Sequence, residues 1–174
     1  MTDGPRGVFD SEAITVLVAG GGGIGSALVS ELLARTNVER VFCLQRNPAN
    51  LAGDARFRTI ACDAGSEESL DAAIGEVEHA CERLHLVINT VGLLHNEACS
   101  PEKRLRNVNA NALETLFRVN AAFLPLLAQR VAPLMKHSEP AVLASLSARV
   151  GSIGDNGMGG WYSYRASKAA HNML

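Results

Sequence analysis

Short apolar runs alternate with segments of helical periodicity along most of this chain. Five runs have the length of β-strands, and they span residues 14–18, 38–45, 57–62, 84–89 and 141–146. The first run is almost continuously apolar, which is typical of a strand buried on both faces. Alternating strands and helices predict an α/β fold, a Rossmann-type doubly wound parallel sheet with helices on both faces.

Helical periodicity follows the first, third and fourth of these strands. A helix is predicted from residue 66 to 83, with Ser66 as its N-cap and two glutamates in the first turn. A longer, mostly apolar helical stretch is predicted over residues 111–137. Pro125 and Pro133 are expected to kink or divide this stretch, because proline removes a helical hydrogen bond.

Two places in the last third break the regular pattern. Asn120 lies among apolar neighbours, and from periodicity alone it is interpreted as a buried amide with satisfied hydrogen bonds. Residues 147–160 hold five glycines and no period, which predicts a loop at the carboxyl end of the fifth strand. Met158 and Trp161 are candidates for contact with an apolar substrate, or for packing.

Length and composition fit one globular domain. The 174 residues are expected to form a flexible lead-in at 1–12 and a nucleotide-binding domain at 13–174. A net charge of −2, without an apolar run of membrane-spanning length, gives no reason to expect nucleic acid or membrane as a partner. Four cysteines without a C-x-x-C motif predict free thiols, mostly buried, in a reducing cytoplasm, and no metal site.

Glycines connect the first strand to the first helix. The strand runs into Gly-Gly-Gly-Gly-Ile-Gly, in which Gly20, Gly22 and Gly25 fit G-x-G-x-x-G. A dinucleotide site needs this context, because the tight turn lets backbone N–H groups approach a pyrophosphate at a helix N-terminus. A merely flexible glycine turn is the alternative interpretation.

The end of the second strand bears on the choice of cofactor. An acidic residue about twenty positions after the glycines would bind the ribose 2′-hydroxyl of NAD. Gln45 and Arg46 occupy that place, and the next acid is Asp54. The planar donors of arginine suit a 2′-phosphate, so the sequence favours NADP(H) over NAD(H). A solvated surface arginine is the alternative.

Tyr164 and Lys168 are four residues apart near the end of the chain. On a helix this spacing puts both side chains on one face. An ammonium beside the phenol favours the phenolate, so the pKa of Tyr164 is predicted to fall below its usual value of about 10. Such a phenol is a general acid or base for a carbonyl and alcohol pair. A half-buried tyrosine beside a solvated lysine is the alternative.

Together these motifs resemble the short-chain dehydrogenase/reductase family over residues 14–174. The matching features are the glycine turn, Asp63, the run Asn89-Thr90-Val91-Gly92, Asn120, and Tyr164 with Lys168. The runs at 151–156 and 159–165 are similar to the C-factor and sniffer-like carbonyl reductases of that family.

The resemblance implies a cofactor-binding set of Gly20, Gly23, Ile24, Gly25, Arg46, Asp63, Asn89, Gly92, Tyr164 and Lys168. In it the glycine turn with Ile24 would cradle the pyrophosphate, and Arg46 would meet the 2′-phosphate. Asp63 would lie near the adenine, with Asn89 and Gly92 bordering the adenosine.

The resemblance also implies a catalytic set of Tyr164, Lys168, Ser147 and Asn120 in an NADPH-dependent carbonyl reductase. Tyr164 would donate the proton, Lys168 would hold the nicotinamide ribose, and Asn120 would support a water in the proton relay. The substrate would be a small-molecule aldehyde or ketone. The protein would assemble as a homodimer or homotetramer. A non-catalytic nucleotide-binding signalling protein of the C-factor type is the alternative function.

The chain departs from the family pattern in three ways. Val18 and Ala19 occupy the first two positions of the usual Thr-Gly-x-x-x-Gly-x-Gly. Ala148 stands where the carbonyl-polarising serine is expected, so Ser147 or Ser152 would supply that hydroxyl, and we expect Ser147. Members usually continue with two further strands and a substrate-covering segment, so the C-terminal part is expected to be missing.

Overall fold

The computed structural model describes residues 7–48, 53–97, 99–157 and 159–174. Contacts within the chain divide it into two compact units. Unit 1 comprises Met1–Thr90 and Ala128–Ser145, and unit 2 comprises Val91–Leu127 and Leu146–Leu174. No described helix has the length and apolar character that a membrane crossing requires.

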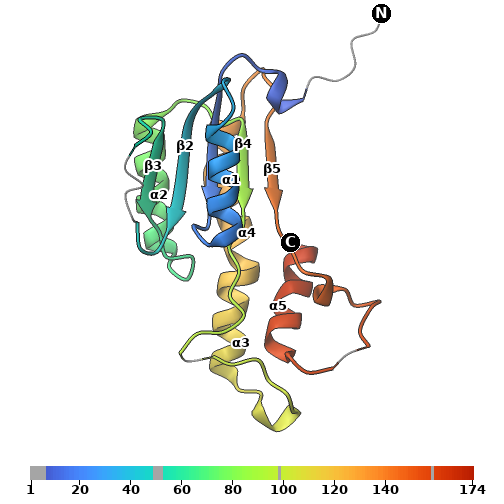
Figure 1. Ribbon diagram of the computed structural model, residues 1–174. Coiled ribbons are helices and arrows are strands. Elements are labelled where there is room, and N and C mark those ends of the chain that lie inside the picture. The colour runs from blue at the N-terminus through green and yellow to red at the C-terminus, as the bar shows by residue number, and fades with distance from the viewer. Residues whose placement is uncertain (1–6, 49–52, 98, 158) are drawn as a thin grey trace, which may run out of the picture. The chain divides into compact units, whose positions relative to one another are not determined.

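Unit 1 contains a five-stranded sheet in the order β3-β2-β1-β4-β5, with every neighbouring pair parallel (Figure 1). Its strands are β1 (Ile14–Ala19), β2 (Val38–Gln45), β3 (Phe57–Ala61), β4 (Leu86–Asn89) and β5 (Val142–Ser145). The chain builds outward from β1 in one direction and then from β4 in the other. The strand order therefore reverses between β1 and β4, where open α/β sheets bind ligands.

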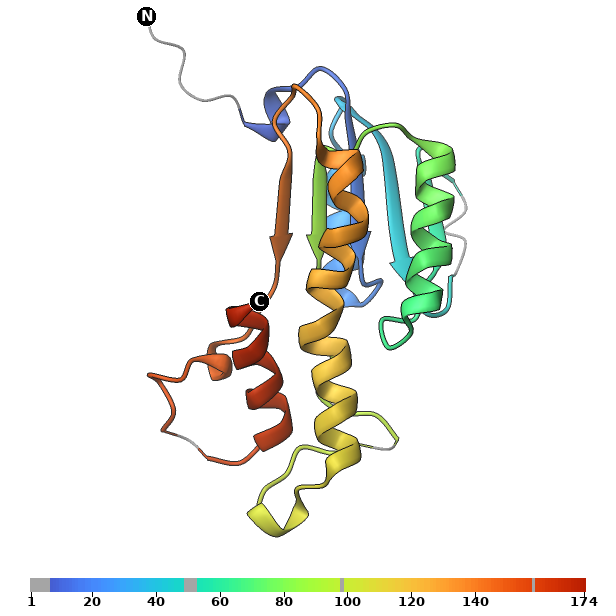
Figure 2. The same ribbon diagram turned by 180° about the vertical axis from the view of Figure 1, so that it is seen from behind.

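Helices cover both faces of this sheet, which confirms the predicted doubly wound fold. Helix α1 (Gly23–Leu33) lies on one face, and α2 (Glu67–Ala80) lies on the other with the end of α4 (Phe123–Met135) (Figures 1 and 2). Ser66 caps α2 as predicted, since its hydroxyl accepts the Ser69 N–H at 3.1 Å.

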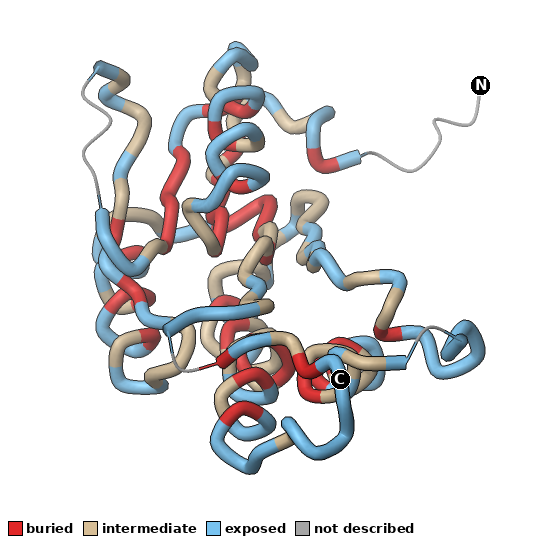
Figure 3. The backbone as a smooth tube through the Cα atoms, turned by 60° about the horizontal axis from the view of Figure 1, so that its bottom comes forward, coloured by how far each residue is buried: buried red, intermediate tan, exposed pale blue. Residues whose placement is uncertain are grey.

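The core of unit 1 forms around β1. Its side chains from Val16 to Ala19 are fully buried, which confirms the prediction of a strand covered on both faces (buried residues are red in Figure 3). The cysteines are free thiols: Cys43, Cys62 and Cys99 are buried, and Cys81 is half-buried. Within the described residues, no three histidine, cysteine or acidic side chains gather as metal ligands would.

Part of the predicted lead-in has defined structure. A short 3-10 turn, η1 (Val8–Asp10), buries Val8 against the core cluster of unit 1. The Asn37 amide donates to the carbonyl oxygens of Phe9 and Ser11 at 3.0 and 3.1 Å. The Arg35 guanidinium lies 4.2 Å from the centre of the Phe9 ring. These contacts attach residues 7–12 to the body of unit 1.

Unit 2 holds the remaining helices, α3 (Ala110–Phe117), the π-helical turn η3 (Arg118–Ala122), the start of α4, and α5 (Tyr162–Met173). The expected division of the long helix occurs at η3, before Pro125 instead of at it. Proline lacks the N–H that an unbroken α-helix would use at that position, and the wider π turn ends at Ala122, shortly before this proline. Pro133 lies within α4, which ends at Met135.

Candidate active site

The turn between β1 and α1 brings two stretches of backbone into contact. Gly20 has a φ of 107°, and a Cβ at Gly25 would lie 1.7 Å from the Gly20 carbonyl oxygen. Gly22 and Gly23 instead border open space, with nothing within 4 Å of a Cβ on either. The first N–H groups of α1 follow Gly22, where no side chain among the described residues provides a cap. This geometry fits a pyrophosphate, which needs close backbone approach and free helix N–H groups.

Thr90 holds this turn in place. Its N–H donates to the Ala19 carbonyl at 2.8 Å, and its hydroxyl lies 3.0 Å from the carbonyl oxygens of both Ala19 and Gly20. Sequence reasoning assigned no role to Thr90, although it lies within the run that follows β4. Its position directly after that strand was the available signal, since neighbouring parallel strands end at one edge.

The other cofactor candidates of unit 1 also follow strand ends. Arg46 comes directly after β2 and is exposed, and Asp63 is exposed shortly after β3. Asn89 is the last residue of β4, and its buried amide donates to the Ser145 hydroxyl at 3.0 Å. Ile24 is 62% exposed in the first turn of α1. Unit 1 thus gathers its candidates at the carboxyl edge of the sheet.

In unit 2, α5 carries Tyr164 and Lys168. Lys168 is 3% exposed, and its ammonium donates to the Leu146 carbonyl at 3.2 Å. A Cβ at Gly92 would lie 3.8 Å from the same ammonium, so these two candidates are neighbours. The indole of Trp161 meets the Tyr164 ring edge-on, with centroids 6.2 Å apart. Met158, the other residue considered for substrate contact, lies outside the described residues.

The pKa of Tyr164 departs from expectation. Burial raises the pKa of the Tyr164 phenol and lowers the pKa of the Lys168 ammonium. The predicted lowering of the tyrosine pKa is therefore wrong for the chain without ligand. The physical reason is desolvation, which disfavours the charged form of each group.

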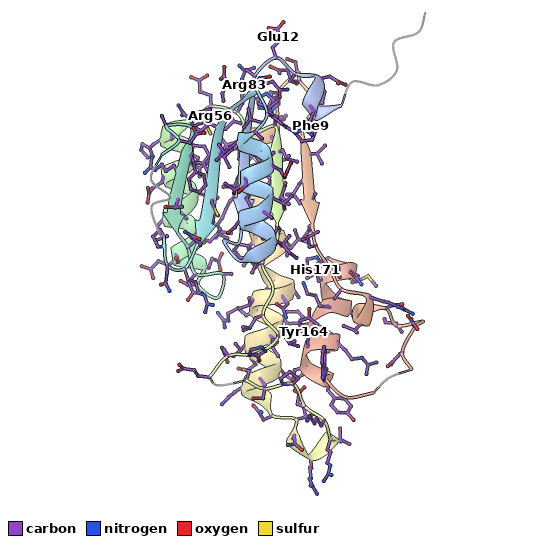
Figure 4. All side chains as sticks on the ribbon, in the orientation of Figure 1. Phe9, Glu12, Arg56, Arg83, Tyr164 and His171 are labelled. Atoms are coloured by element: carbon purple, nitrogen blue, oxygen red, sulfur yellow. The ribbon has the colours of Figure 1, made fainter. Side chains whose placement is uncertain are left out.

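Asn120 is the centre of a buried hydrogen-bond chain. Its side chain accepts the Leu93 N–H at 2.7 Å and donates to the Leu93 carbonyl at 2.8 Å. It also donates to the Ser167 hydroxyl at 3.0 Å, which in turn donates to the Tyr164 carbonyl at 2.7 Å. Nδ1 of His171 lies 2.8 Å from the Asn120 carbonyl oxygen (Figure 4 labels His171 and Tyr164). The interpretation of Asn120 as a satisfied buried amide is confirmed, and the chain links it to the backbone of Tyr164.

Both serine candidates engage their hydroxyls within unit 2. Ser147 donates to the Asn172 side-chain oxygen at 2.5 Å, and the Ser152 hydroxyl accepts the Asp155 N–H at 3.2 Å. Asn172 follows Tyr164 by about two helical turns on α5. The hydroxyl of Ser147 is therefore held near the end of that helix.

The chain belongs to the short-chain dehydrogenase family, whose model matches residues 14–174. A curated relative is the 1-hydroxy-2-glutathionyl-2-methyl-3-butene dehydrogenase of Rhodococcus sp. (strain AD45). It is 33% identical over 164 residues, which cover 92% of this chain and 67% of the relative. The predicted family is thereby confirmed.

Solved structures agree in fold. The NADPH-bound carbonyl reductase from chicken fatty liver is 26% identical, with a TM-score of 0.81, covering 94% of this chain and 68% of that one. The carbonyl reductase Sniffer of D. melanogaster also has a TM-score of 0.81 at 23% identity, covering 92% of this chain and 72% of that one. The chain is thus an oxidoreductase-family member with carbonyl reductases among its structural neighbours.

Proposed function

We propose that this protein reduces a small-molecule aldehyde or ketone to an alcohol with NADPH. The observation that carries the proposal is the buried ammonium of Lys168, one helical turn after Tyr164 on α5. No ion pair of the described residues includes Lys168. A buried charge without a counter-ion is costly and is characteristic of functional sites.

The cofactor assignment is supported by the glycine turn and by Arg46. The open backbone at Gly22 and Gly23 would receive the pyrophosphate, and the exposed guanidinium of Arg46 would bind the 2′-phosphate. The chicken carbonyl reductase with NADPH bound is consistent with this choice. Asp63, Asn89 and Gly92 would border the adenosine part.

In the mechanism, NADPH supplies the hydride when it is bound. Tyr164 supplies the proton for the carbonyl oxygen, and its raised pKa keeps the phenol protonated at neutral pH, as a proton donor requires. Lys168 would hold the nicotinamide ribose and stabilise the phenolate that remains after transfer. Asn120 would support a water that returns the proton. Ser147 would stabilise the developing negative charge on the oxygen.

The direct test compares two tyrosine variants. The purified protein would be mixed with NADPH and a panel of aldehydes and ketones, and loss of NADPH absorbance would be followed. Tyr164→Phe is expected to lower kcat by more than about a hundredfold and to retain NADPH binding. The control is Tyr162→Phe, the same change at the only other tyrosine. Near-normal turnover by Tyr164→Phe would exclude Tyr164 as proton donor.

The catalytic hydroxyl needs its own comparison. Ser147→Ala is expected to lower kcat by about a hundredfold and to leave NADPH binding unchanged. Ser152→Ala is the matched control, because that hydroxyl caps a loop N–H. If only Ser152→Ala loses activity, the assignment of Ser147 is wrong.

A second function is favoured by two observations. Ala148 occupies the position expected for the polarising serine, and the Ser147 hydroxyl is bound to Asn172. A protein that binds NADPH without turnover, as a signalling module, would tolerate both features. NADPH binding without oxidation by any carbonyl of the panel would support this alternative. Assembly as a homodimer or homotetramer stays a prediction from the family resemblance, and a cytoplasmic location stays a prediction from the pattern of cysteines.

A further inference from the structure

Glu102 is a buried acid in the segment of unit 2 that precedes the 3-10 turn η2 (Leu105–Asn107). It is 4% exposed, and none of the ion pairs formed by the described residues includes it. A buried carboxylate has to be stabilised by hydrogen-bond donors. Ser163 provides two: its hydroxyl bonds to one carboxylate oxygen, and its N–H lies 3.4 Å from the other.

The start of α5 has an unusual backbone. Gly159, Gly160 and Trp161 have φ values of 65°, 66° and 49°, and Trp161 is the one non-glycine residue with positive φ in the described chain. Such a conformation is strained for a residue with a Cβ and persists only when surrounding contacts enforce it. The Trp161 N–H donates to the main-chain carbonyl of Glu102 at 2.6 Å. The main chain of Glu102 therefore holds Trp161, and its side chain holds Ser163, at the start of α5.

Glu102 also serves as the missing cap of α5. Trp161 stands at the N-cap position and makes no side-chain cap bond. The Ser163 N–H belongs to the first turn, whose N–H groups have no partner inside the helix. A carboxylate at this place accepts such an N–H and is favoured by the positive end of the helix dipole.

The first turn of α5 contains Tyr164, directly after Ser163. The later turns have other attachments: Ser167 bonds to Asn120, and Lys168 bonds to the Leu146 carbonyl. The Glu102 carboxylate thus holds the N-terminal side of the turn from which the phenol projects, while the Ser167 hydroxyl holds the Tyr164 carbonyl on its other side.

We propose that Glu102 is a positioning residue for the reaction, and that its buried carboxylate caps α5 and fixes the Tyr164 phenol. The inference rests on the proposed function for the role of Tyr164, whereas the contact itself does not. Losing the carboxylate would free the Ser163 N–H and hydroxyl in the first turn of α5 and let the phenol move toward water, while the main-chain bond from Trp161 to Glu102 stays.

The first experiment needs no enzymatic activity. Glu102→Ala would be compared with Glu102→Gln, which keeps an acceptor oxygen, and with Glu97→Gln at an exposed acid of the same segment. The phenol of Tyr164 would be titrated by its absorbance, taking the difference from Tyr164→Phe. Glu102→Ala is expected to bring the pKa of Tyr164 down toward its ordinary value and to increase amide exchange in residues 159–165 by about tenfold or more. Glu102→Gln should show a smaller change, and Glu97→Gln none.

The second experiment measures kinetics on the same variants. Glu102→Ala is expected to lower kcat by about ten- to a hundredfold with KM for NADPH within about twofold, because only the proton donor is displaced. If Glu102→Ala fails to fold, Ser163→Ala removes the hydroxyl donor from the other side. The fluorescence of Trp161, the only tryptophan, reports whether the backbone at the start of α5 has changed.

The outcomes separate this proposal from the proposed function. An unchanged Tyr164 titration and unchanged exchange in Glu102→Ala would overturn the positioning role. A shifted titration with unchanged kcat would reduce Glu102 to a purely structural anchor and also overturn it. If none of the carbonyls of the panel makes the unaltered protein oxidise NADPH, the proposed function fails. The titration of Tyr164 still decides whether Glu102 fixes the phenol.

Discussion

Gly25 lies directly against the carbonyl oxygen of Gly20, with space for no side chain between them. A Cβ at residue 25 would come within 1.7 Å of that oxygen and 3.0 Å of the Thr90 hydroxyl. Since Thr90 also fixes the Ala19 and Gly20 carbonyls, the turn cannot yield without breaking these bonds. The junction of β1 and α1 is therefore set by backbone contact.

Gly25→Ala is expected to destabilise the protein by about 3 kcal/mol and to abolish NADPH binding, because the methyl group collides with main-chain atoms. Urea unfolding and fluorescence titration with NADPH would measure the two effects. Gly23→Ala is the matched control, as its methyl group would enter open space. Gly23→Ala should leave the free energy of unfolding nearly unchanged and should weaken only the binding of NADPH. Equal stability of the two variants would contradict this account of the turn.

Arg46 is predicted to distinguish the two nicotinamide cofactors. Arg46→Glu should weaken NADPH binding by about ten- to a hundredfold, because a charge-assisted contact to the 2′-phosphate is replaced by repulsion. NADH, which lacks that phosphate, should change by less than about threefold. Dissociation constants for both cofactors would be measured at fixed salt, with Arg106→Glu as a control of equal charge change at an exposed site. Equal losses for both cofactors would remove Arg46 from the phosphate site.

Asn120 is predicted to stabilise unit 2 through its side chain. Asn120→Ala would leave the Leu93 N–H and carbonyl and the Ser167 hydroxyl without this partner, at a cost of about 2 to 4 kcal/mol. Chemical unfolding followed by circular dichroism would measure the loss. Asn111→Ala, at an exposed position of α3, should stay within about 0.5 kcal/mol of the unaltered protein. A similar small effect at Asn120 would show that water replaces the amide.

Buried thiols predict a loss of stability at alkaline pH. Burial raises the pKa of Cys43 and of Cys62 from 9.0 to about 11. Between these values the folded chain binds more protons than the unfolded one, so stability is fully present below pH 9.0 and falls as pH rises toward 11. Each thiol would contribute about 2 to 3 kcal/mol to this fall.

Urea unfolding of the reduced protein at pH 8, 9 and 10 would test the sign and size of this effect. Cys43→Ala should add a constant penalty for the lost volume and make the pH dependence shallower. Labelling with a thiol reagent at pH 8 should modify the half-buried Cys81 before Cys43 and Cys62. A pH dependence as steep in the variant as in the unaltered protein would show that other groups cause it.

The pattern of apolar and polar residues predicted most of the sheet, because the features that define these strands and helices lie close together along the chain. The apolar run of β1, the glycines that follow it and the Ser66 cap each act through neighbours along the chain. The same is true of the spacing of Tyr164 and Lys168, which puts both on α5. The π turn at η3 escaped prediction, since a proline indicates a break without specifying its form or place.

The amino-acid sequence by itself determined the family, the doubly wound sheet and the candidate residues, since periodicity and motif spacing depend on short-range chemistry. Only the tertiary structure decided which distant groups meet. Thr90 reaches Gly20, Asn120 reaches Leu93 and Ser167, and Glu102 reaches Ser163 from 61 residues away. It also decided the direction of the Tyr164 pKa, because desolvation depends on what surrounds a side chain after folding and not on its neighbours in the chain.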